Sequence, residues 1–210
     1  MVTGASFPKI EDITDGALTD AGRVLEQGTI VLLAPGPRFW PIFTQSPEWI
    51  ERHPDPVDAW SERVISELAV QLGGETMFPF GGPPYQPFLK WAVESGEAFP
   101  SPTGPLVHAR LGMMISYRGA IRVPYDLGAR RQENPCESCA DKPCLTACPV
   151  SALSEATAYD VPSCYDYLRT EEGQTSCYSA GCAVRRACPI SVGAHRDPSQ
   201  SAYHMTRFLP

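Results

Sequence analysis

The sequence has no long hydrophobic run, no excess of basic charge and no cysteine before position 136. Its longest apolar run, Ile30 to Ala34, is far too short to cross a bilayer. The net charge is −7, and neither residues 1–130 (10 basic, 15 acidic) nor residues 131–210 (7 basic, 9 acidic) form a basic platform. We therefore expect no membrane span, and the charge argues against a large nucleic-acid footprint.

The N-terminus also lacks the features of an export signal. Residues Met1 to Ile10 contain no basic region followed by an apolar run. Disulfide frameworks need an oxidising compartment, which a protein without an export signal does not reach. We therefore expect a cytoplasmic protein whose cysteines are reduced.

All eight cysteines lie between positions 136 and 188, in two runs with one isolated cysteine between them. The first run holds Cys136, Cys139, Cys144 and Cys148, the isolated position is Cys164, and the second run holds Cys177, Cys182 and Cys188. Each run closes on Cys-Pro, as in proteins with two 4Fe–4S clusters, where the cysteine before proline binds the other cluster. Eight thiolates satisfy two such clusters with none left over.

The spacing departs from the usual Cys-x2-Cys-x2-Cys-x3-Cys-Pro. One gap in the first run has four residues, and the gaps of the second run have four and five. We interpret these insertions as enlarged cluster loops or as a sign that one cluster is labile. Three other hypotheses stay open, of which the least favoured is that the eight cysteines are unrelated buried thiols. A disulfide framework would suit an oxidising compartment, and structural zinc would use two groups of four ligands, although only Cys136 and Cys139 form the Cys-x2-Cys pair that zinc sites favour.

The chain before the cysteines predicts an α/β (α+β) domain over residues 1–130, and residues 131–210 form a separate cysteine-rich module. Residues 1–28 predict a helical lead-in, with Thr14 and Thr19 as candidate caps. The apolar run from position 29 to 34, bounded by glycine and proline, predicts a buried central strand.

A helix is predicted from Pro56, with Asp55 as its cap and Gly73 at its end. A strand over residues 75–80 follows, near a sheet edge because it contains Pro79. This strand–helix–strand unit predicts a right-handed crossover and a parallel strand pair.

The remaining segments before the cysteines predict a helix over residues 87–94 and strands in the second half of residues 107–123, with a turn at Gly119. A tight turn precedes that helix, and its glycines, Gly81 and Gly82, allow a backbone or a planar ligand to approach closely. We include both glycines, with Tyr85, in a candidate cofactor-binding site.

The cysteine module resembles the iron–sulfur module of epoxyqueuosine reductase and related cobalamin-dependent reductases. The resemblance covers the first cysteine run, Cys164 with the residues up to Glu171, and the segment from Gly181 to Pro189. It implies a small ferredoxin-like module with two 4Fe–4S clusters. By this resemblance one cluster is held by Cys136, Cys139, Cys144 and Cys188, and the other by Cys148, Cys164, Cys177 and Cys182.

The N-terminal part resembles the cobalamin-processing CblC family, which has a flavin-reductase-like fold. The pieces that carry the resemblance are Asp55-Pro-Val-Asp58, His108-Ala-Arg110-Leu-Gly112 and Arg118-Gly119. It implies a sheet domain that binds a corrinoid such as cobalamin, or less favourably a flavin, with His108, Arg110 and Gly112 at the cofactor. In that family an arginine of the His-x-Arg segment lies by the thiol-cosubstrate site, which makes Arg110 the candidate catalytic residue.

These patterns favour an iron–sulfur redox protein, for which two hypotheses remain. In the first, it is an oxidoreductase of the cobalamin-linked type, whose clusters relay single electrons to a cofactor in the N-terminal domain. In the second, it is a ferredoxin-like electron carrier with no cofactor besides the clusters. Either would need an electron-donor protein such as a flavodoxin, a ferredoxin or a reductase. No aspartate lies between Phe80 and Leu111, where epoxyqueuosine reductase carries its proton donor, so we expect no tRNA-modifying reaction.

Overall fold

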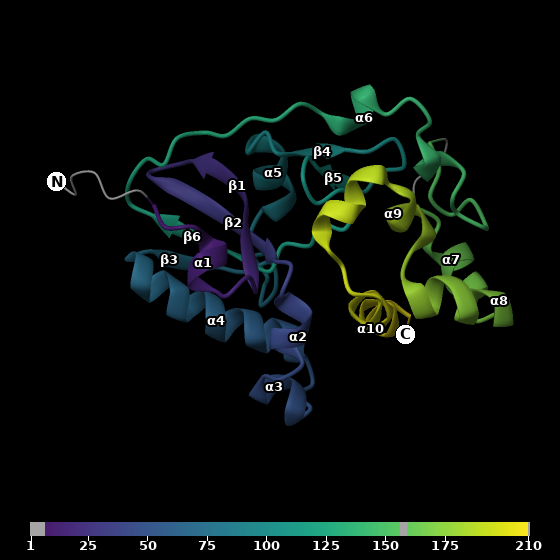
Figure 1. Cartoon of the computed structure of the whole chain (residues 1–210), viewed down its shortest axis with the longest axis horizontal. Helices are drawn as coiled ribbons and strands as arrows, with labels where there is room; N and C mark the ends of the chain where they lie inside the picture. Colours follow the sequence, from purple (N-terminus) through teal and green to yellow (C-terminus); the bar gives the residue numbers. More distant parts are fainter. Residues whose placement is uncertain (1–6, 156–158, 210) are drawn as a thin grey trace. The chain divides into compact units, whose positions relative to one another are not determined.

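The computed structural model describes residues 7–155 and 159–209 (Figure 1). The chain divides into two compact units. The sheet unit comprises the residues up to Glu97 together with Ser116–Gln132, and the cysteine unit comprises Ala98–Ile115 together with the residues from Glu133 onward. The boundary between Gln132 and Glu133 lies close to the domain boundary expected between residues 130 and 131. Residues 98–115, which the sequence assigned to the N-terminal domain, instead belong to the cysteine unit.

The sheet unit is built on a four-stranded antiparallel sheet with the order β1-β2-β6-β3. The strands are β1 (Leu18–Leu25), β2 (Thr29–Pro35), β3 (Glu75–Met77) and β6 (Gly119–Val123). Strand β2 lies inside the sheet, and its side chains from Ile30 to Ala34 are fully buried, as the apolar run predicts. Strand β3 lies at the sheet edge, as predicted, but it is shorter than the predicted span of 75–80 and ends before Pro79. The protein is thus of the mixed α+β type.

Three sequence predictions in this unit are wrong. The expected N-terminal helix is a single turn, α1 (Ile10–Ile13), and the rest of its described span includes strand β1, which pairs with β2; residues 1–6 lie outside the described residues. A register shift between Asp20 and Arg23 interrupts the strand's two-residue alternation and hides it from pattern analysis. The parallel pair is absent because β6 lies between β2 and β3 and pairs antiparallel with both. Gly119 begins β6 instead of forming a turn.

Helix α4 (Pro56–Leu72) has the predicted bounds. Pro56 occupies its first turn, and Gly73 ends it in the left-handed conformation, with φ of 64°. The helix packs against β3 and β6. The other helices of this unit are α2 (Phe39–Phe43), α3 (Pro47–Ile50) and α5 (Phe88–Glu94). No helix among the described residues is long and apolar enough to span a bilayer.

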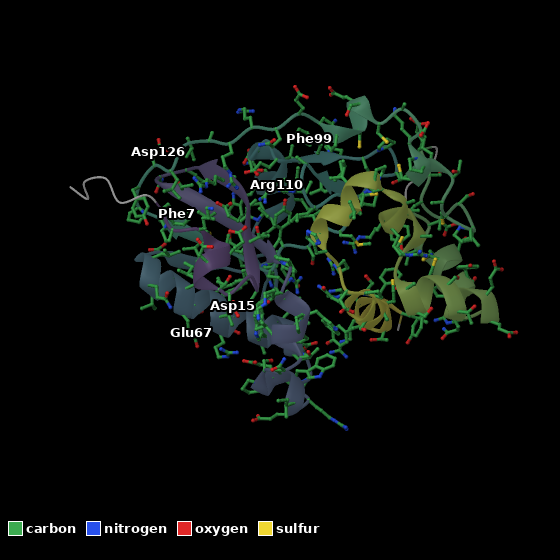
Figure 2. The ribbon with its side chains drawn as sticks, viewed as in Figure 1. Phe7, Asp15, Glu67, Phe99, Arg110 and Asp126 are labelled. Carbon is green, nitrogen blue, oxygen red and sulfur yellow. The ribbon has the colours of Figure 1, made fainter. Side chains whose placement is uncertain are left out.

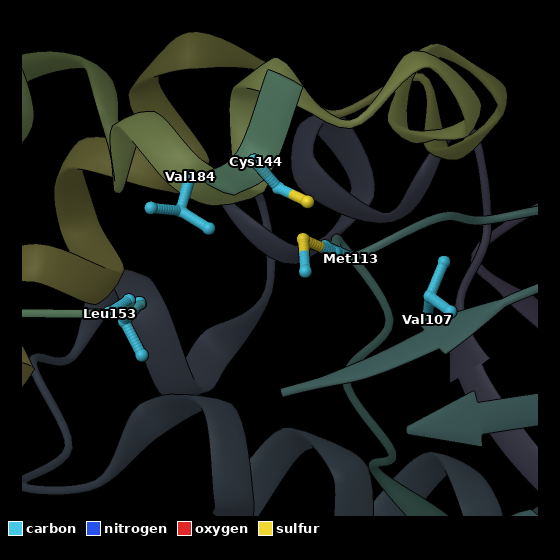
Figure 3. Close-up of a cluster of buried hydrophobic side chains, with 5 residues drawn as sticks. All are labelled: Val107, Met113, Cys144, Leu153 and Val184. Atoms are coloured by element: carbon cyan, nitrogen blue, oxygen red, sulfur yellow. The ribbon is translucent and has the colours of Figure 1, made fainter. Parts of the chain in front are cut away.

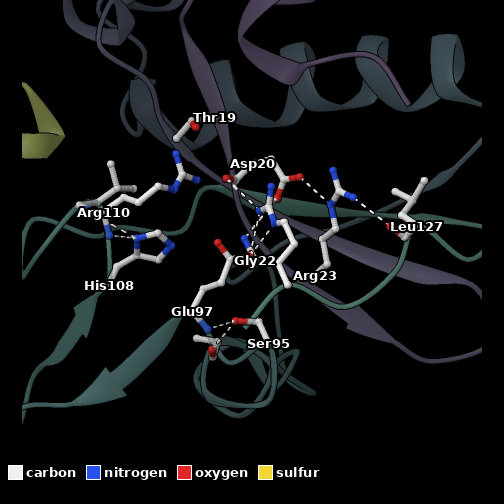
Figure 4. A network of polar contacts seen from close by, with 12 residues as sticks. Thr19, Asp20, Gly22, Arg23, Ser95, Glu97, His108, Arg110 and Leu127 are labelled. Atoms are coloured by element: carbon white, nitrogen blue, oxygen red, sulfur yellow. Dashed lines mark hydrogen bonds and ion pairs between the residues drawn. The ribbon is translucent and has the colours of Figure 1, made fainter. Parts of the chain in front are cut away.

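A buried polar network ties the ends of the sheet unit together (Figure 4). Asp20 on β1 and Glu97 after α5, which we call the acidic pair, are 5% and 1% exposed. Arg130 reaches both carboxylates, at 2.7 Å from Asp20 and 2.9 Å from Glu97, and Arg23 lies 2.9 Å from Asp20. Buried carboxylates persist only where cations or hydrogen bonds compensate them. Arg130 therefore holds residues 116–132 onto β1.

The cysteine unit starts with a hairpin of β4 (Ala98–Pro100) and β5 (Leu106–His108). All regular structure described after residue 133 is helical. It comprises α6 (Pro135–Ser138), η1 (Pro143–Leu145), α7 (Val161–Leu168), α8 (Glu171–Gly173), the π-helical segment η2 (Gln174–Tyr178), α9 (Ala183–Ala187), η3 (Pro189–Ala194) and α10 (Pro198–Phe208). Most of these segments are one or two turns long, because prolines and caps restart the chain between the cysteines.

Candidate metal centre

The first cysteine run is folded by two short helical turns. Asn134 caps α6 by accepting a hydrogen bond from the Cys136 amide at 3.0 Å, and Cys139 ends the same turn. Lys142 then adopts a left-handed conformation, with φ of 38°, which reverses the chain before η1 places Cys144. The four-residue gap noted in the sequence thus forms a turn that returns the third cysteine toward the first two.

The remaining cysteines lie within or at the ends of later helical segments. Asp160 caps α7, whose second turn carries Cys164. Cys177 lies in η2, and π-helical turns of this kind often occur at functional sites. Cys182 and Cys188 flank α9 as its N-cap and C-cap.

The thiols of the first predicted quartet are neighbours in the structure. We call Cys136, Cys139, Cys144 and Cys188 group A. Burial raises the pKa of Cys136, and the charges of Cys144, Cys188 and Cys139 act in the same direction. Burial likewise raises the pKa of Cys144, with Cys188 and Cys139 as its charged neighbours. The structure therefore brings together three cysteines of the first run with the last cysteine of the chain.

The other four cysteines form a second neighbourhood, which we call group B: Cys148, Cys164, Cys177 and Cys182. Burial raises the pKa of Cys164, a hydrogen bond with Tyr159 opposes this effect, and the charges of Cys182, Cys148 and Cys177 raise it further. Burial also raises the pKa of Cys182, for which Cys177 is a charged neighbour. In each run the cysteine that precedes proline belongs with the other run's group.

Group A lines a cavity of about 400 Å³. The four cysteines share its wall with apolar side chains such as Val107 and Met113. Figure 3 shows a hydrophobic cluster that shares Val107, Met113 and Cys144 with this lining and also contains Leu153 and Val184; all five residues are at most 7% exposed. Cysteines of both groups pack against this cluster. The cavity therefore has sulfur donors on an apolar, rigid support.

Group B has a different cover. Cys177 packs with Leu168 and with Met205 of α10 in a second hydrophobic cluster, and Cys164 lies against its edge. Phe208 of the same helix packs on Tyr165, with ring centroids 5.1 Å apart, and stacks on Tyr159 at 6.2 Å. Helix α10 therefore covers group B with apolar and aromatic side chains.

Backbone and side-chain donors point at sulfur atoms of group B, and the amides of Val184 and Arg185 donate to Cys182. The amide of Ala152 donates to Cys148 Sγ at 3.2 Å. The hydroxyl of Tyr159 donates to Cys164, and burial together with this bond raises the tyrosine pKa. Hydrogen bonds to ligand sulfurs are among the means by which a protein sets the potential of an iron–sulfur cluster. Tyr159 was not recognised from the sequence, although its position five residues before Cys164 was a usable signal.

None of the eight cysteines, all of which lie in the described part of the chain, forms a disulfide. Within residues 7–155 and 159–209, no three His, Cys, Asp or Glu side chains converge tightly enough to hold a single metal ion. The side chains of both units are drawn in Figure 2, with sulfur in yellow.

The predicted cofactor residues of the His-x-Arg segment form a tight loop in the cysteine unit. Buried His108 accepts hydrogen bonds at Nδ1 from the amides of Arg110 and Leu111, at 3.1 and 3.2 Å, as Figure 4 shows for Arg110. Gly112, with φ of 56°, faces η3 so closely that a Cβ would lie 2.3 Å from the Ser191 amide nitrogen. These contacts give His108 and Gly112 roles in folding the loop. The side chain of Arg110 is exposed, and its catalytic role stays a prediction.

The other predicted cofactor residues belong to the sheet unit. The ring of Tyr85 packs on Gly82, and the position of a Cβ at Gly81 is open. Tyr85 itself is 67% exposed. Two further pieces of the CblC resemblance meet here, because Arg118 pairs with Asp58 at 3.2 Å. Burial lowers the pKa of Arg118 and Asp58 raises it, as expected for an ion pair that supports the fold.

Comparison with known proteins adds no family assignment, since no protein-family model, no curated protein and no solved structure matches this chain.

Proposed function

We propose that this protein binds two 4Fe–4S clusters, one at group A and one at group B, and relays single electrons through them. The observation that carries the proposal is the division of the eight cysteines into two neighbourhoods of four. In each run, the cysteine that precedes proline lies in the neighbourhood of the other run. That exchange is the ligand pattern of two-cluster ferredoxins.

The donor set and the cavity fit a polynuclear centre. A single zinc ion draws its thiolates in to about 2.3 Å, whereas a cubane occupies a larger space among four sulfurs. A cavity of about 400 Å³ lined by group A supports the larger centre. When bound, the clusters supply one-electron redox chemistry.

The protein's own residues have three tasks in this function. The cysteines supply thiolates, and binding displaces their protons, which burial otherwise favours. The apolar clusters around Val184 and Leu168 exclude water. The donors at Ala152 and Tyr159 orient the sulfurs of group B.

We further propose, on the resemblance to cobalamin-linked reductases, that the electron acceptor is a corrinoid bound by the chain in the cytoplasm, and that the electron donor is a flavodoxin, a ferredoxin or a reductase. A carrier whose only cofactors are the clusters is the alternative. The antiparallel sheet and the helices of the sheet unit agree with a corrinoid-binding domain in fold class only.

The test is anaerobic reconstitution of the full chain, followed by iron analysis and visible spectroscopy. About eight irons per chain with a broad charge-transfer absorption is the expected result. No cluster absorption after reconstitution would overturn the proposal. Titration with hydroxocobalamin then distinguishes the two acceptors: a saturable change in the corrin bands supports the reductase, and no change supports the carrier.

A further inference from the structure

Helix α9 joins the two cysteine groups. Its N-cap is Cys182 of group B, and its C-cap is Cys188 of group A. With a rise of 1.5 Å per residue, six steps separate the two Cα atoms by about 9 Å. A charge fixed on this helix therefore lies close to the proposed centres.

Arg185, in the middle of α9, is held in one position by neutral partners. Its Nε donates to the carbonyl of Met113 at 2.6 Å, and its Nη2 donates to the carbonyl of Ile115 at 3.1 Å. Its own carbonyl accepts a hydrogen bond from Ser191 at 2.7 Å, and the Ser191 hydroxyl also accepts from the Met113 amide at 3.1 Å. The guanidinium is thus anchored on a loop far away in the sequence.

In the part of the chain that the structure describes, the charge of Arg185 is not balanced by a carboxylate. The backbone amide of Arg185 donates a hydrogen bond to the Cys182 sulfur, which places the residue beside group B. Burial lowers the pKa of Arg185, and the negative charge of Cys182 opposes that effect. Arginine does not lose its proton in proteins, so the half-buried guanidinium of Arg185 is stabilised by negative charge nearby. Group B supplies that charge.

We propose that Arg185 is a positioning residue that raises the reduction potential of the centre held by group B. This inference rests on the proposed function. Reduction adds one electron from the donor protein to that centre, and the guanidinium neither gains nor loses a proton. The fixed positive charge therefore stabilises the reduced, more negative state over the oxidised one.

Arg185→Met in the full, anaerobically reconstituted chain tests the proposal, with Arg186→Met as a matched control. Arg186 is the next residue of the same helix, but it is exposed, and its Nε donates to the Gly181 carbonyl at 3.0 Å. The readout is a redox titration followed by electron paramagnetic resonance. At a fixed potential, we expect the ratio of reduced to oxidised group B centre to fall at least tenfold in Arg185→Met, which corresponds to 59 mV for a one-electron couple.

The group A centre is the internal reference and should shift less, and Arg186→Met should leave both potentials unchanged. Unchanged potentials in an Arg185→Met protein that holds about eight irons would overturn the inference. An equal shift of both centres would also overturn it, because a general loosening of the unit has no preference for group B.

If Arg185→Met binds less iron, two further variants show whether the charge of Arg185 sets the potential. Arg185→Gln is neutral but still donates hydrogen bonds, and Arg185→Lys keeps the charge. A lower potential in the Gln variant alone supports a charge effect, whereas equal shifts in both variants overturn it. Failure of the parent protein to bind clusters would refute the proposed function itself, and this outcome is separate from the result for Arg185.

Discussion

The division of the cysteines into groups A and B predicts how much iron each cysteine variant loses, and this loss depends on the group and not on the position along the chain. Cys144 and Cys148 are close in sequence but belong to groups A and B, whereas Cys144 and Cys188 are far apart and share group A. A cubane that loses one of its four thiolates is expected to be lost as a whole. Each single alanine variant should therefore keep about four of the eight irons.

The double variants carry the test. Cys144→Ala/Cys188→Ala removes two ligands of one centre and should still keep about four irons, whereas Cys144→Ala/Cys148→Ala should keep close to none. Iron analysis and electron paramagnetic resonance after anaerobic reconstitution provide the measurement, and Ser138→Ala, in the same loop, should keep all the iron. Loss of all iron in the first double variant, or retention of four irons in the second, would refute the grouping. Far-UV circular dichroism shows whether each variant retains its helices.

Three further predictions concern the stability of the protein as measured by urea unfolding of the full chain. Gly112→Ala should lower the free energy of unfolding by about 2–4 kcal/mol, because the new Cβ adds overpacking to the penalty of the left-handed backbone. Gly73→Ala is the control, because its Cβ would enter open space, and it should lower the free energy of unfolding by only about 1 kcal/mol. Similar losses in the two variants would contradict the packing of Gly112 against η3. Hydrogen bonds from Arg63 lower the pKa of Glu48 from 4.5 to about 2, so the carboxylate contributes stability above pH 4.5 that is lost as the pH falls toward 2. Because this ion pair reaches solvent, Glu48→Gln should cost about 1 kcal/mol at pH 7 and progressively less below pH 4.5, and a loss independent of pH would rule out this origin. Arg130→Met removes a cation that both members of the acidic pair share and should lower the free energy of unfolding by about 3 kcal/mol, and Arg130→Lys should restore part of that stability. A loss below about 1 kcal/mol would show that other partners are sufficient to compensate the two carboxylates.

Local patterns alone were enough for several elements. The apolar run that became β2 and the helix from Pro56 to Leu72 were predicted with nearly correct bounds. Their signals are carried by neighbouring residues, such as continuous apolar side chains, Pro56 in the first helical turn and Gly73 after the last. In the same way the sequence determined that seven cysteines lie in two runs closed by Cys-Pro and that Cys164 lies between them, since this is a property of order and spacing.

Contacts between distant residues were decided only by the tertiary structure. Strand β1 exists because β2 pairs with it across a bulge, and β6 enters the sheet between β2 and β3 from more than 40 residues along the chain. Residues 98–115 join the cysteine unit because Gly112 lets its backbone lie directly on η3. The environment of Arg185 likewise depends on carbonyls about 70 residues away, so its charge next to Cys182 has no local signature. The sequence thus determined which residues can donate sulfur, and the fold decided which sulfurs and which charges become neighbours, because free energy from packing depends on contacts that no local window contains.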